Sequence, residues 1–477
     1  MGKSKKHNIR GRKGRRFAEE LKGISLDQIL IVPIDTAKYH PKALVCNYFG
    51  DIFEDSFFFS VNSAGLSELN NKIRKCAECC NAKRILVGIE ATGHYHEDIV
   101  RYLENCGYQV TIINAYTTSE ERASALNWAK TDDLDLAAIA VAIMQNKGTE
   151  SKLPSGIYDK LLAITRARRS EVNKRSTLQV EIRQFMDLIW PGFQAITEVQ
   201  DGKPQTKQVF SDFWGNASCF LMRHYPLPQQ VLALGADGLR QISKEHKLKL
   251  RCSTIDKLLD VARLALNKTP DSLEVELLLL QMKLDDRERA NQNIAILEQK
   301  IEEFLVQTPG VLLLSTPEIG LITAAEFTAE AGPIEQYTNA GQLIKKAGTN
   351  PLVSQTGGGD PVYGPISKQG NSHFRTVIYS IGFNLANGRT NPYFKLFAGR
   401  LRDRGKKSRQ IWIATGNKFV KVAFALLRDK KLFNPPLWDG APLTKEVLVK
   451  IKDKTNQIVA QNTLDSLLNN QAQQEAC

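Results

Sequence analysis

The feature that most constrains the fold is a set of short apolar segments between about Gln28 and Ala115, the first three of which follow one another with no helical segment between them. These three read QILIVPID, KALVCNYFG and IFEDSFFFSV. Two more, RILVGIE and YQVTIINA, follow at wider intervals. Their length, alternation and content of β-branched and aromatic residues predict five strands.

The order of these strands favours one α/β fold over another. Helices are predicted over Ala64 to about Cys79, over about His96 to Asn105, and from near Thr131, so helices and strands alternate only after the third strand. A Rossmann fold would place a helix and a glycine-rich turn directly after the first strand, where this chain has DTAKYHPKA. We therefore expect an α/β ribonuclease-H-like domain whose first connection is a hairpin-like turn.

Four carboxylates occupy related positions in this domain. Asp35 ends the first strand and Glu90 ends the fourth, and these two strands are neighbours in a ribonuclease-H-like sheet. Asp132 and Asp135 open the helix that begins near Thr131, and their i, i+3 spacing puts them on one face, one turn apart. Asp133 points away from that face and is left out of the set. The spacing predicts that four acids converge.

Converging carboxylates repel and raise one another's pKa unless a cation joins them. Mg²⁺ takes hard oxygen ligands, and two ions roughly 3.5 to 4 Å apart can stabilise both the attacking and the leaving oxygen of a phosphoryl transfer. The set therefore predicts phosphodiester chemistry at a site of two Mg²⁺ ions, with Mn²⁺ as a substitute. Taken singly, each acid also has an ordinary explanation, as a strand-end turn former, a surface acid or a residue that favours a helix N-terminus.

The rest of the chain predicts a multidomain protein. We expect a basic N-terminal arm over 1–27, the catalytic domain over 28–150, long helices over 151–307 with an inserted subdomain at about 190–267, a mainly helical C-terminal domain over 308–434, and a polar tail over 435–477. The helices predicted from Leu161 to about Ile189 and from about Ser272 to Val306 suit an antiparallel or dimeric coiled coil. Two ordinary amphipathic helices on a core fit the same pattern equally well.

The charge distribution indicates a polyanionic partner. The formal net charge is +13; eight Lys or Arg lie in the first sixteen residues, and residues 402–409 hold five more. Two separate basic clusters favour nucleic acid over a merely solvated tail. We expect a cytoplasmic protein, because we find neither a membrane-spanning stretch nor the apolar part of a signal peptide.

The cysteines offer one competing site. The run CAECC, Cys76 to Cys80, contains a C-x-x-C, but no second pair stands at a zinc-site spacing. We expect buried free thiols there instead.

The acidic residues stand in blocks that resemble a known family. IDTAK, IEATGHY and KTDDLDLAAIA are similar, in order and spacing, to the three blocks of DEDD-type insertion-sequence transposases, the bridge-RNA-guided recombinases with a RuvC-like domain, a group that includes Piv-type DNA invertases. The segments TPEIGLITAAEFTAEAG, LIKKAGTNP and GPISKQGNSHFRT resemble that family's second domain. The blocks cover about Gln28 to Asn434 apart from the insertion.

The resemblance implies a two-part active site. Asp35, Glu90, Asp132 and Asp135 align with the metal-binding tetrad, and Ser367 aligns with the serine that is transiently joined to a DNA 5′ phosphate. A metal site supplies the activation that a serine hydroxyl needs as a nucleophile. From its residues alone, Ser367 reads equally well as a turn or helix-cap residue.

The resemblance also implies partners. These are donor and target DNA, a bridge RNA encoded in the element, and further copies of the chain in a dimer or tetramer, acting at the nucleoid. We expect nucleic-acid contacts from Lys38, Lys368, Asn371, Arg375, Arg402, Arg404, Lys406, Lys407 and Arg409, with a solvated basic face as the alternative for these cations.

Two departures and three rival functions remain open. Pro33 stands where a small residue is expected, which could alter the strand edge, and the inserted subdomain is longer than the family leads us to expect. The rivals are a Piv-like site-specific invertase, a junction-resolving nuclease that uses only the metal site, and a non-catalytic nucleic-acid-binding protein.

Overall fold

The computed structural model describes residues 11–124, 131–151, 156–200, 203–266, 268–355, 359–389 and 391–433. The start of the basic arm and the whole polar tail, both named above, lie outside these residues. The chain divides into two compact units, residues 1–153 and 154–477, which are described separately. No helix in the described part has the length and apolar character needed to cross a membrane.

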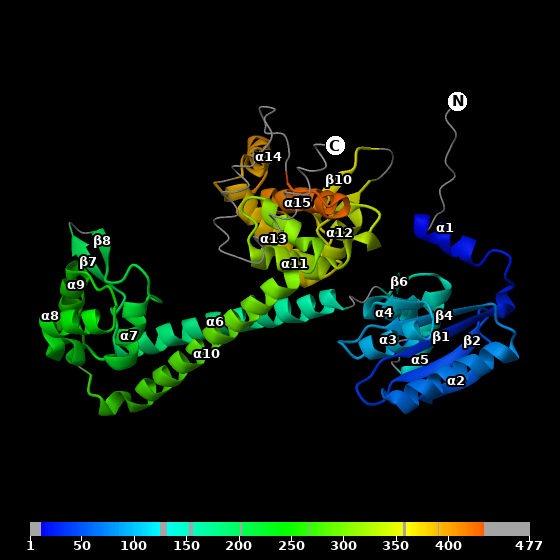
Figure 1. Cartoon of the computed structure of the whole chain (residues 1–477), viewed down its shortest axis with the longest axis horizontal. Coiled ribbons are helices and arrows are strands. Elements are labelled where there is room, and N and C mark those ends of the chain that lie inside the picture. Colours follow the sequence, from blue (N-terminus) through cyan, green and yellow to red (C-terminus); the bar gives the residue numbers. More distant parts are fainter. Residues whose placement is uncertain are drawn as a thin grey trace. The chain divides into compact units, whose positions relative to one another are not determined.

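The first unit is built on a mixed six-stranded sheet (Figure 1). Its strands are β1 (Ile29–Asp35), β2 (Lys42–Asn47), β3 (Ile52–Phe58), β4 (Arg84–Glu90), β5 (Val110–Ile113) and β6 (Thr149–Glu150), in the order β3-β2-β1-β4-β5-β6. β1 pairs antiparallel with β2 and parallel with β4, so the predicted neighbourhood of the first and fourth strands is confirmed.

Helices cover both faces of this sheet. α2 (Ser63–Cys79) and α3 (Glu97–Asn105) pack on one face, and α5 (Asp132–Met144) packs on the other. Three elements were not predicted from the sequence: α1 (Gly11–Glu20), α4 (Ala115–Ser124) and β6. Cys76 of α2 is buried as expected, but Cys79 is exposed, because α2 turns only one side to the sheet.

Pro33 does not disturb the strand that carries it. It lies inside β1, a central strand, and pairs with Gly88 of β4 in the parallel ladder. The register between β1 and β2 is the same before Pro33 as after it. The expected change at the strand edge is therefore absent from this ladder.

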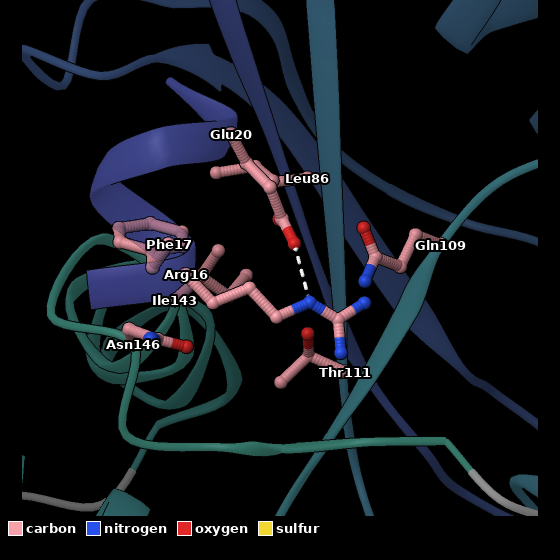
Figure 2. Close-up of a pocket in the computed structure, with 8 residues that line it drawn as sticks. All are labelled: Arg16, Phe17, Glu20, Leu86, Gln109, Thr111, Ile143 and Asn146. Carbon is pink, nitrogen blue, oxygen red and sulfur yellow. Dashed lines mark hydrogen bonds and ion pairs between the residues drawn. The ribbon is translucent and has the colours of Figure 1, made fainter. Parts of the chain in front are cut away.

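A small pocket lies where α1 meets the sheet and the end of α5 (Figure 2). Arg16 extends from α1 into it and makes an ion pair with Glu20 at 2.9 Å. Thr111 of β5 and Leu86 of β4 line the pocket from the sheet side. It lies toward the starts of these strands, whereas the candidate acids lie at or beyond strand ends.

The second unit begins with two long helices, α6 (Ile157–Ile189) and α10 (Glu274–Leu305), which lie side by side (Figure 1). Arg168 of α6 pairs with Glu298, whereas Glu181, further along α6, pairs with Lys283. Partner numbers fall along α10 as they rise along α6, so the two helices are antiparallel within one chain.

A subdomain interrupts the chain between these helices. It contains β7 (Ala195–Gln200), β8 (Lys203–Gln208), α7 (Asn216–His224), α8 (Pro228–Glu245) and α9 (Cys252–Leu264). Its aromatic core surrounds Trp190 and Phe193 and includes the ends of α6 and α10 that face it.

The C-terminal part of the unit is mainly helical. Its elements follow one another along the chain in this order: the 3₁₀-helix η3 (Pro309–Ser315), α11 (Leu321–Ala331), the 3₁₀-helix η4 (Ile334–Gln336), α12 (Ala340–Ala347), the hairpin β9 (Pro351–Ser354) and β10 (Val362–Ile366), α13 (Ser372–Asn387), α14 (Pro392–Asp403) and α15 (Ser408–Asp429). α13 and α15 pack closely, and the core around Phe327, Phe374 and Phe419 joins them to α11. Ser367 follows β10 directly.

Candidate active site

The alternation of side chains along the strands decides which way the first two acids face. In β1 the even-numbered apolar residues pack toward α2 and α3, and Ile29 and Ile31 pack toward α5. In β4, Val87 and Ile89 pack toward α2 and α3. Because successive strand residues point to opposite faces, Asp35 and Glu90 are placed on the α5 side.

The second two acids come from the start of α5. Thr131 caps this helix by accepting a hydrogen bond from the backbone N–H of Leu134 at 3.3 Å. Asp132 is exposed at the first position of the helix, and Asp135 is buried one turn later. The same helix face continues into the apolar residues that pack on β1.

The electrostatics of Asp35 show that these acids are near one another. The pKa of Asp35 is raised from 3.8 to about 6, first by burial and then by the negative charges of Glu90, Asp135 and Asp132, in that order of importance. A hydrogen bond from the backbone of Thr36 opposes the shift. Like charges act in this way only at short range, so β1, β4 and α5 bring four carboxylates into one electrostatic neighbourhood.

A cation of the protein itself already faces one of these acids. Arg122 of α4 lies 2.9 Å from Asp135 Oδ1, and both side chains are largely buried. The two atoms are not aligned as a hydrogen bond, and Asp135 Oδ1 has no hydrogen-bond partner among the described residues. The negative charge of Asp135 is therefore only partly compensated.

The chemistry of these side chains suits them as ligands of a divalent cation. The donors are carboxylate oxygens; one of them, Asp135 Oδ1, is buried without a hydrogen bond, and the pKa of another, Asp35, is raised by burial and by its acidic neighbours. Among the described residues, however, no three His, Cys, Asp or Glu side chains are drawn together as a ready metal cluster. The four acids lie on the α5 side of the sheet, but their side chains do not converge on one metal position.

Asp133 belongs to a different contact. It pairs with Lys42 of β2 at 2.6 Å, and hydrogen bonds from Lys42 and Ser56 hold the pKa of Asp133 below its ordinary value. This pairing agrees with its exclusion from the predicted set.

Ser367 lies in the second unit, at the base of the β9–β10 hairpin, and is half-buried. Its Oγ donates to Asn350 Oδ1 at 3.0 Å, and its backbone N–H donates to the Asn350 carbonyl at 2.8 Å. Asn350 immediately precedes β9, so the two ends of the hairpin hold the hydroxyl between them.

The residues after Ser367 form a tight turn, 367–371, here called the serine turn. Lys368 has φ 55°, a left-handed conformation that side chains other than glycine seldom adopt. A Cβ on Gly370 would lie 2.3 Å from the Lys346 carbonyl oxygen. Glycine is therefore required where the turn approaches the end of α12.

Two residues predicted to contact nucleic acid hold this turn in place. Asn371 caps α13 by accepting a hydrogen bond from the Phe374 N–H at 3.0 Å. Arg375 donates to the carbonyls of Ala347 and Lys368, each at 3.1 Å. Both side chains thus have partners within the protein.

The other predicted nucleic-acid contacts are surface cations. Arg402 donates to the Ala386 carbonyl at 3.0 Å and so also supports the end of α13. Lys38 Nζ lies 4.8 Å from the centre of the Tyr39 ring. The exposed members of the set are Lys38, Lys368, Arg402, Arg404, Lys406, Lys407 and Arg409.

Sequence reasoning missed three residues that contact the candidate site. Arg122 had no signal, because α4 was not predicted. Asn350 and Glu330 lie inside the quoted blocks LIKKAGTNP and TPEIGLITAAEFTAEAG, but nothing in those blocks shows that Asn350 accepts the Ser367 hydroxyl. Glu330 accepts a hydrogen bond from Asn371 at 2.6 Å.

Comparison with known proteins finds matches in both units. Residues 32–191 match the IS110-type DEDD transposase family, described as Transposase. Residues 311–398 match the family described as Transposase IS116/IS110/IS902 family.

Individual relatives agree with these matches. The "Insertion element IS116 uncharacterized 44.8 kDa protein" of Streptomyces clavuligerus is 22% identical over 354 residues, 73% of this chain and 83% of that protein. The "Pilin gene-inverting protein" of Moraxella bovis is 26% identical over 149 residues, 30% of this chain and 46% of that protein. The "Insertion element IS900 uncharacterized 42 kDa protein" of Mycobacterium paratuberculosis is 27% identical over 135 residues, 28% of this chain and 33% of that protein.

Proposed function

Because the chain belongs to the IS110 family of insertion-sequence transposases, we propose that it cuts and rejoins the DNA strands of a mobile element with a divalent-metal site and a serine nucleophile. The observation that carries this proposal is the neighbourhood of Asp35, Glu90, Asp132 and Asp135, seen in the raised pKa of Asp35. A transposase function alone would not require four acids on one face of a sheet.

We infer that the first unit is a ribonuclease-H-like, RuvC-like domain. Supporting this are three antiparallel strands, the parallel neighbours β1, β4 and β5, and a helix that carries acids across the β1–β4 face. We also take α6 and α10 to be an antiparallel coiled coil that carries the inserted subdomain.

The four carboxylates would hold Mg²⁺, as two ions and with Mn²⁺ as a substitute, and the bound metal would polarise the scissile phosphate and favour loss of the serine proton. Their charges favour a cation because those of Glu90, Asp135 and Asp132 add to the effect of burial in opposing ionisation of Asp35. Arg122 would help to hold the carboxylate of Asp135 in place.

Ser367 would attack the phosphorus atom of the scissile phosphodiester with its Oγ. A bond forms between Oγ and phosphorus while the bond to the 3′ oxygen breaks; the serine proton passes to solvent water and the 3′ oxygen takes one up from it, which leaves a free 3′ hydroxyl and a 5′ phosphate joined to the serine. Asn350 orients the hydroxyl but is too weak a base to take its proton. Attack by a 3′ hydroxyl on this linkage then rejoins DNA and releases Ser367, so no net hydrolysis or nucleotide cofactor is needed.

The partners in this proposal are donor and target DNA, a bridge RNA encoded in the element, and other copies of the chain. The exposed cations of residues 402–409 supply phosphate contacts on the second unit. A Piv-like invertase would use the same chemistry on an invertible segment, and the similarity to a pilin gene-inverting protein supports that alternative.

A strand-cleavage assay with labelled element-end DNA, its RNA and Mg²⁺ tests the mechanism. We expect Ser367→Ala to abolish DNA–protein adducts and recombination, and Asp35→Asn to lower cleavage by about 10²- to 10³-fold. The matched controls are Ser372→Ala, at the exposed start of α13, and Asp133→Asn, whose carboxylate pairs with Lys42. Both controls should keep adduct formation.

The alternatives give different results in the same assay. Cleavage that persists in Ser367→Ala but is lost in Asp35→Asn would identify a metal-dependent nuclease without a covalent intermediate. If the wild-type protein binds DNA but never cleaves it, a non-catalytic role replaces the proposal.

A further inference from the structure

A buried carboxylate at the end of α11 has no role in the chemistry described above. The Glu330 side chain is only 4% exposed. It makes a two-pronged ion pair with Arg166 of α6, whose Nε and Nη2 donate to its two oxygens at 2.9 and 3.0 Å. A carboxylate is costly to bury unless its partners are well placed, so the position of this group is tightly determined.

The same carboxylate also binds the serine turn. Glu330 Oε2, one of the oxygens held by Arg166, accepts a hydrogen bond from Asn371 Nδ2 at 2.6 Å. The Asn371 backbone N–H donates to the Lys346 carbonyl at 2.7 Å. Asn371 is the last residue of the turn, so Glu330 fixes its downstream end between α11, α12 and α6.

The upstream end of the turn has separate anchors. Ser367 is held by Asn350, and the Lys368 N–H donates to the Gly348 carbonyl at 3.0 Å. With the left-handed Lys368 between the two ends, few backbone conformations of the turn satisfy both. Loss of the downstream anchor therefore releases the segment that carries the hydroxyl.

We propose that Glu330 is a positioning residue for Ser367. By binding both Arg166 and Asn371, Glu330 couples the long helix α6 to the serine turn. This inference rests on the proposed role of Ser367 as the nucleophile. In it, Arg166 fixes the carboxylate, the carboxylate fixes Asn371, and Asn371 fixes the turn.

A neighbouring ion pair provides a matched control. Arg169 of α6 pairs with Glu326 of α11 at 2.7 Å, and Glu326 is also largely buried. The two acids are four residues apart on α11 and the two arginines three apart on α6, so both pairs join the same two helices. Among the described residues, only Glu330 of these four has a recorded hydrogen bond to the serine turn.

Amide hydrogen exchange of the full chain tests the coupling without any reaction. A glutamine has one acceptor oxygen and one NH₂ group where the glutamate has two oxygens, so Glu330→Gln cannot keep all three hydrogen bonds from Arg166 and Asn371 and loses the ion pair that fixes the group. We expect exchange in peptides covering residues 365–376 to rise about tenfold in Glu330→Gln and to stay near wild type in Glu326→Gln. Equal exchange in the two variants would overturn the proposal.

A second variant separates this contact from helix capping. Asn371→Asp keeps a carboxylate oxygen to cap α13 but sets a negative charge against Glu330. We expect the same rise in exchange around Ser367 with the α13 amides still protected. Loss of protection along the whole of α13 would show that the residue acts only as a cap.

A kinetic measurement links the turn to the chemistry. In single-turnover reactions at saturating DNA, Glu330→Gln should form the serine adduct about tenfold more slowly or worse, with an unchanged Kd for DNA, and Glu326→Gln should react at the wild-type rate. A faster-exchanging turn with an unchanged adduct rate would refute the positioning role. If the wild-type protein forms no adduct, the proposed nucleophile is wrong, whereas the exchange contrast still reports whether the coupling exists.

Discussion

At the residue scale, the raised pKa of Asp35 makes the stability of the first unit depend on pH. In the unfolded chain its carboxyl loses a proton near the ordinary value of 3.8, but in the folded, metal-free protein it does so only near 6. The unfolded state thus binds fewer protons between these values, so this group destabilises the fold increasingly as pH rises from about 4 to about 6, and the full effect persists above that range.

Asp35→Asn should therefore raise the Tm of the metal-free protein at pH 8 and leave it nearly unchanged at pH 4. Thermal unfolding in EDTA at both values measures this. With excess MgCl₂ at pH 8 the order should reverse, because the wild-type site gains a stabilising ligand that the variant binds poorly. A wild-type Tm that exceeds that of the variant in EDTA at pH 8 would contradict the electrostatic account.

At the scale of elements, the distance between α5 and the sheet determines where Asp132 and Asp135 lie. Gly88 of β4 allows a close approach, since a Cβ there would lie 2.4 Å from the Ile143 Cγ1 of α5. We expect Gly88→Ala to lower the free energy of unfolding by about 1–3 kcal/mol and to reduce cleavage, because α5 must move outward. Denaturant unfolding and the strand-cleavage assay measure the two effects.

A double-mutant cycle with Ile143→Ala provides the control for this contact. Ile143→Ala alone costs stability by leaving a cavity, but it removes the atoms that the new methyl group meets. The double variant should therefore be more stable than the sum of the single losses predicts. Strict additivity would show that Gly88 does not set this spacing.

The strands found from the sequence are those with continuous or alternating apolar residues, and the helices found are those that lie between such strands or are long. The five strands, the helices α2, α3, α5, α6 and α10 and the β1–β4 neighbourhood follow from periodicity and chain order. α4 and β6 were missed because α4 is a ten-residue helix with few apolar residues and β6 spans only two residues. The pairing of α6 with α10 in one chain stayed open, since heptad-like spacing does not say which helix is the partner.

The candidate site was predictable to a different extent in each unit. Strand ends and an i, i+3 pair are local signals, so the acids could be placed on one face from spacing. Ser367 came from resemblance alone, because its setting depends on Asn350 and Glu330, which are distant in sequence and were not recognised as its supports. Contacts between residues distant in sequence produce no repeating pattern of residue types from which they could be predicted.

At the scale of the whole molecule, the acids and the serine belong to different compact units. If the acids of one copy act with the serine of another, a mixture of Asp35→Asn and Ser367→Ala proteins should regain activity. Random pairing in a dimer leaves about a quarter of such shared sites intact. Recombination by proteins refolded or coexpressed together measures the recovery, and each variant alone is the control.

The absence of any recovery, with mixed oligomers demonstrated by two affinity tags, would place both parts of the site in one copy. Recovery without mixed oligomers would point to wild-type contamination.

The 33-residue helix α6 connects the inserted subdomain to the surroundings of the serine turn. It extends about 50 Å; Arg166 lies near its start, and Met186, near its end, is buried in the core of the inserted subdomain. A stiff rod of that length turns a small tilt at one end into a measurable displacement at the other. A shift of the inserted subdomain would therefore be carried along α6 to Arg166, and from there through Glu330 to the segment that bears the hydroxyl.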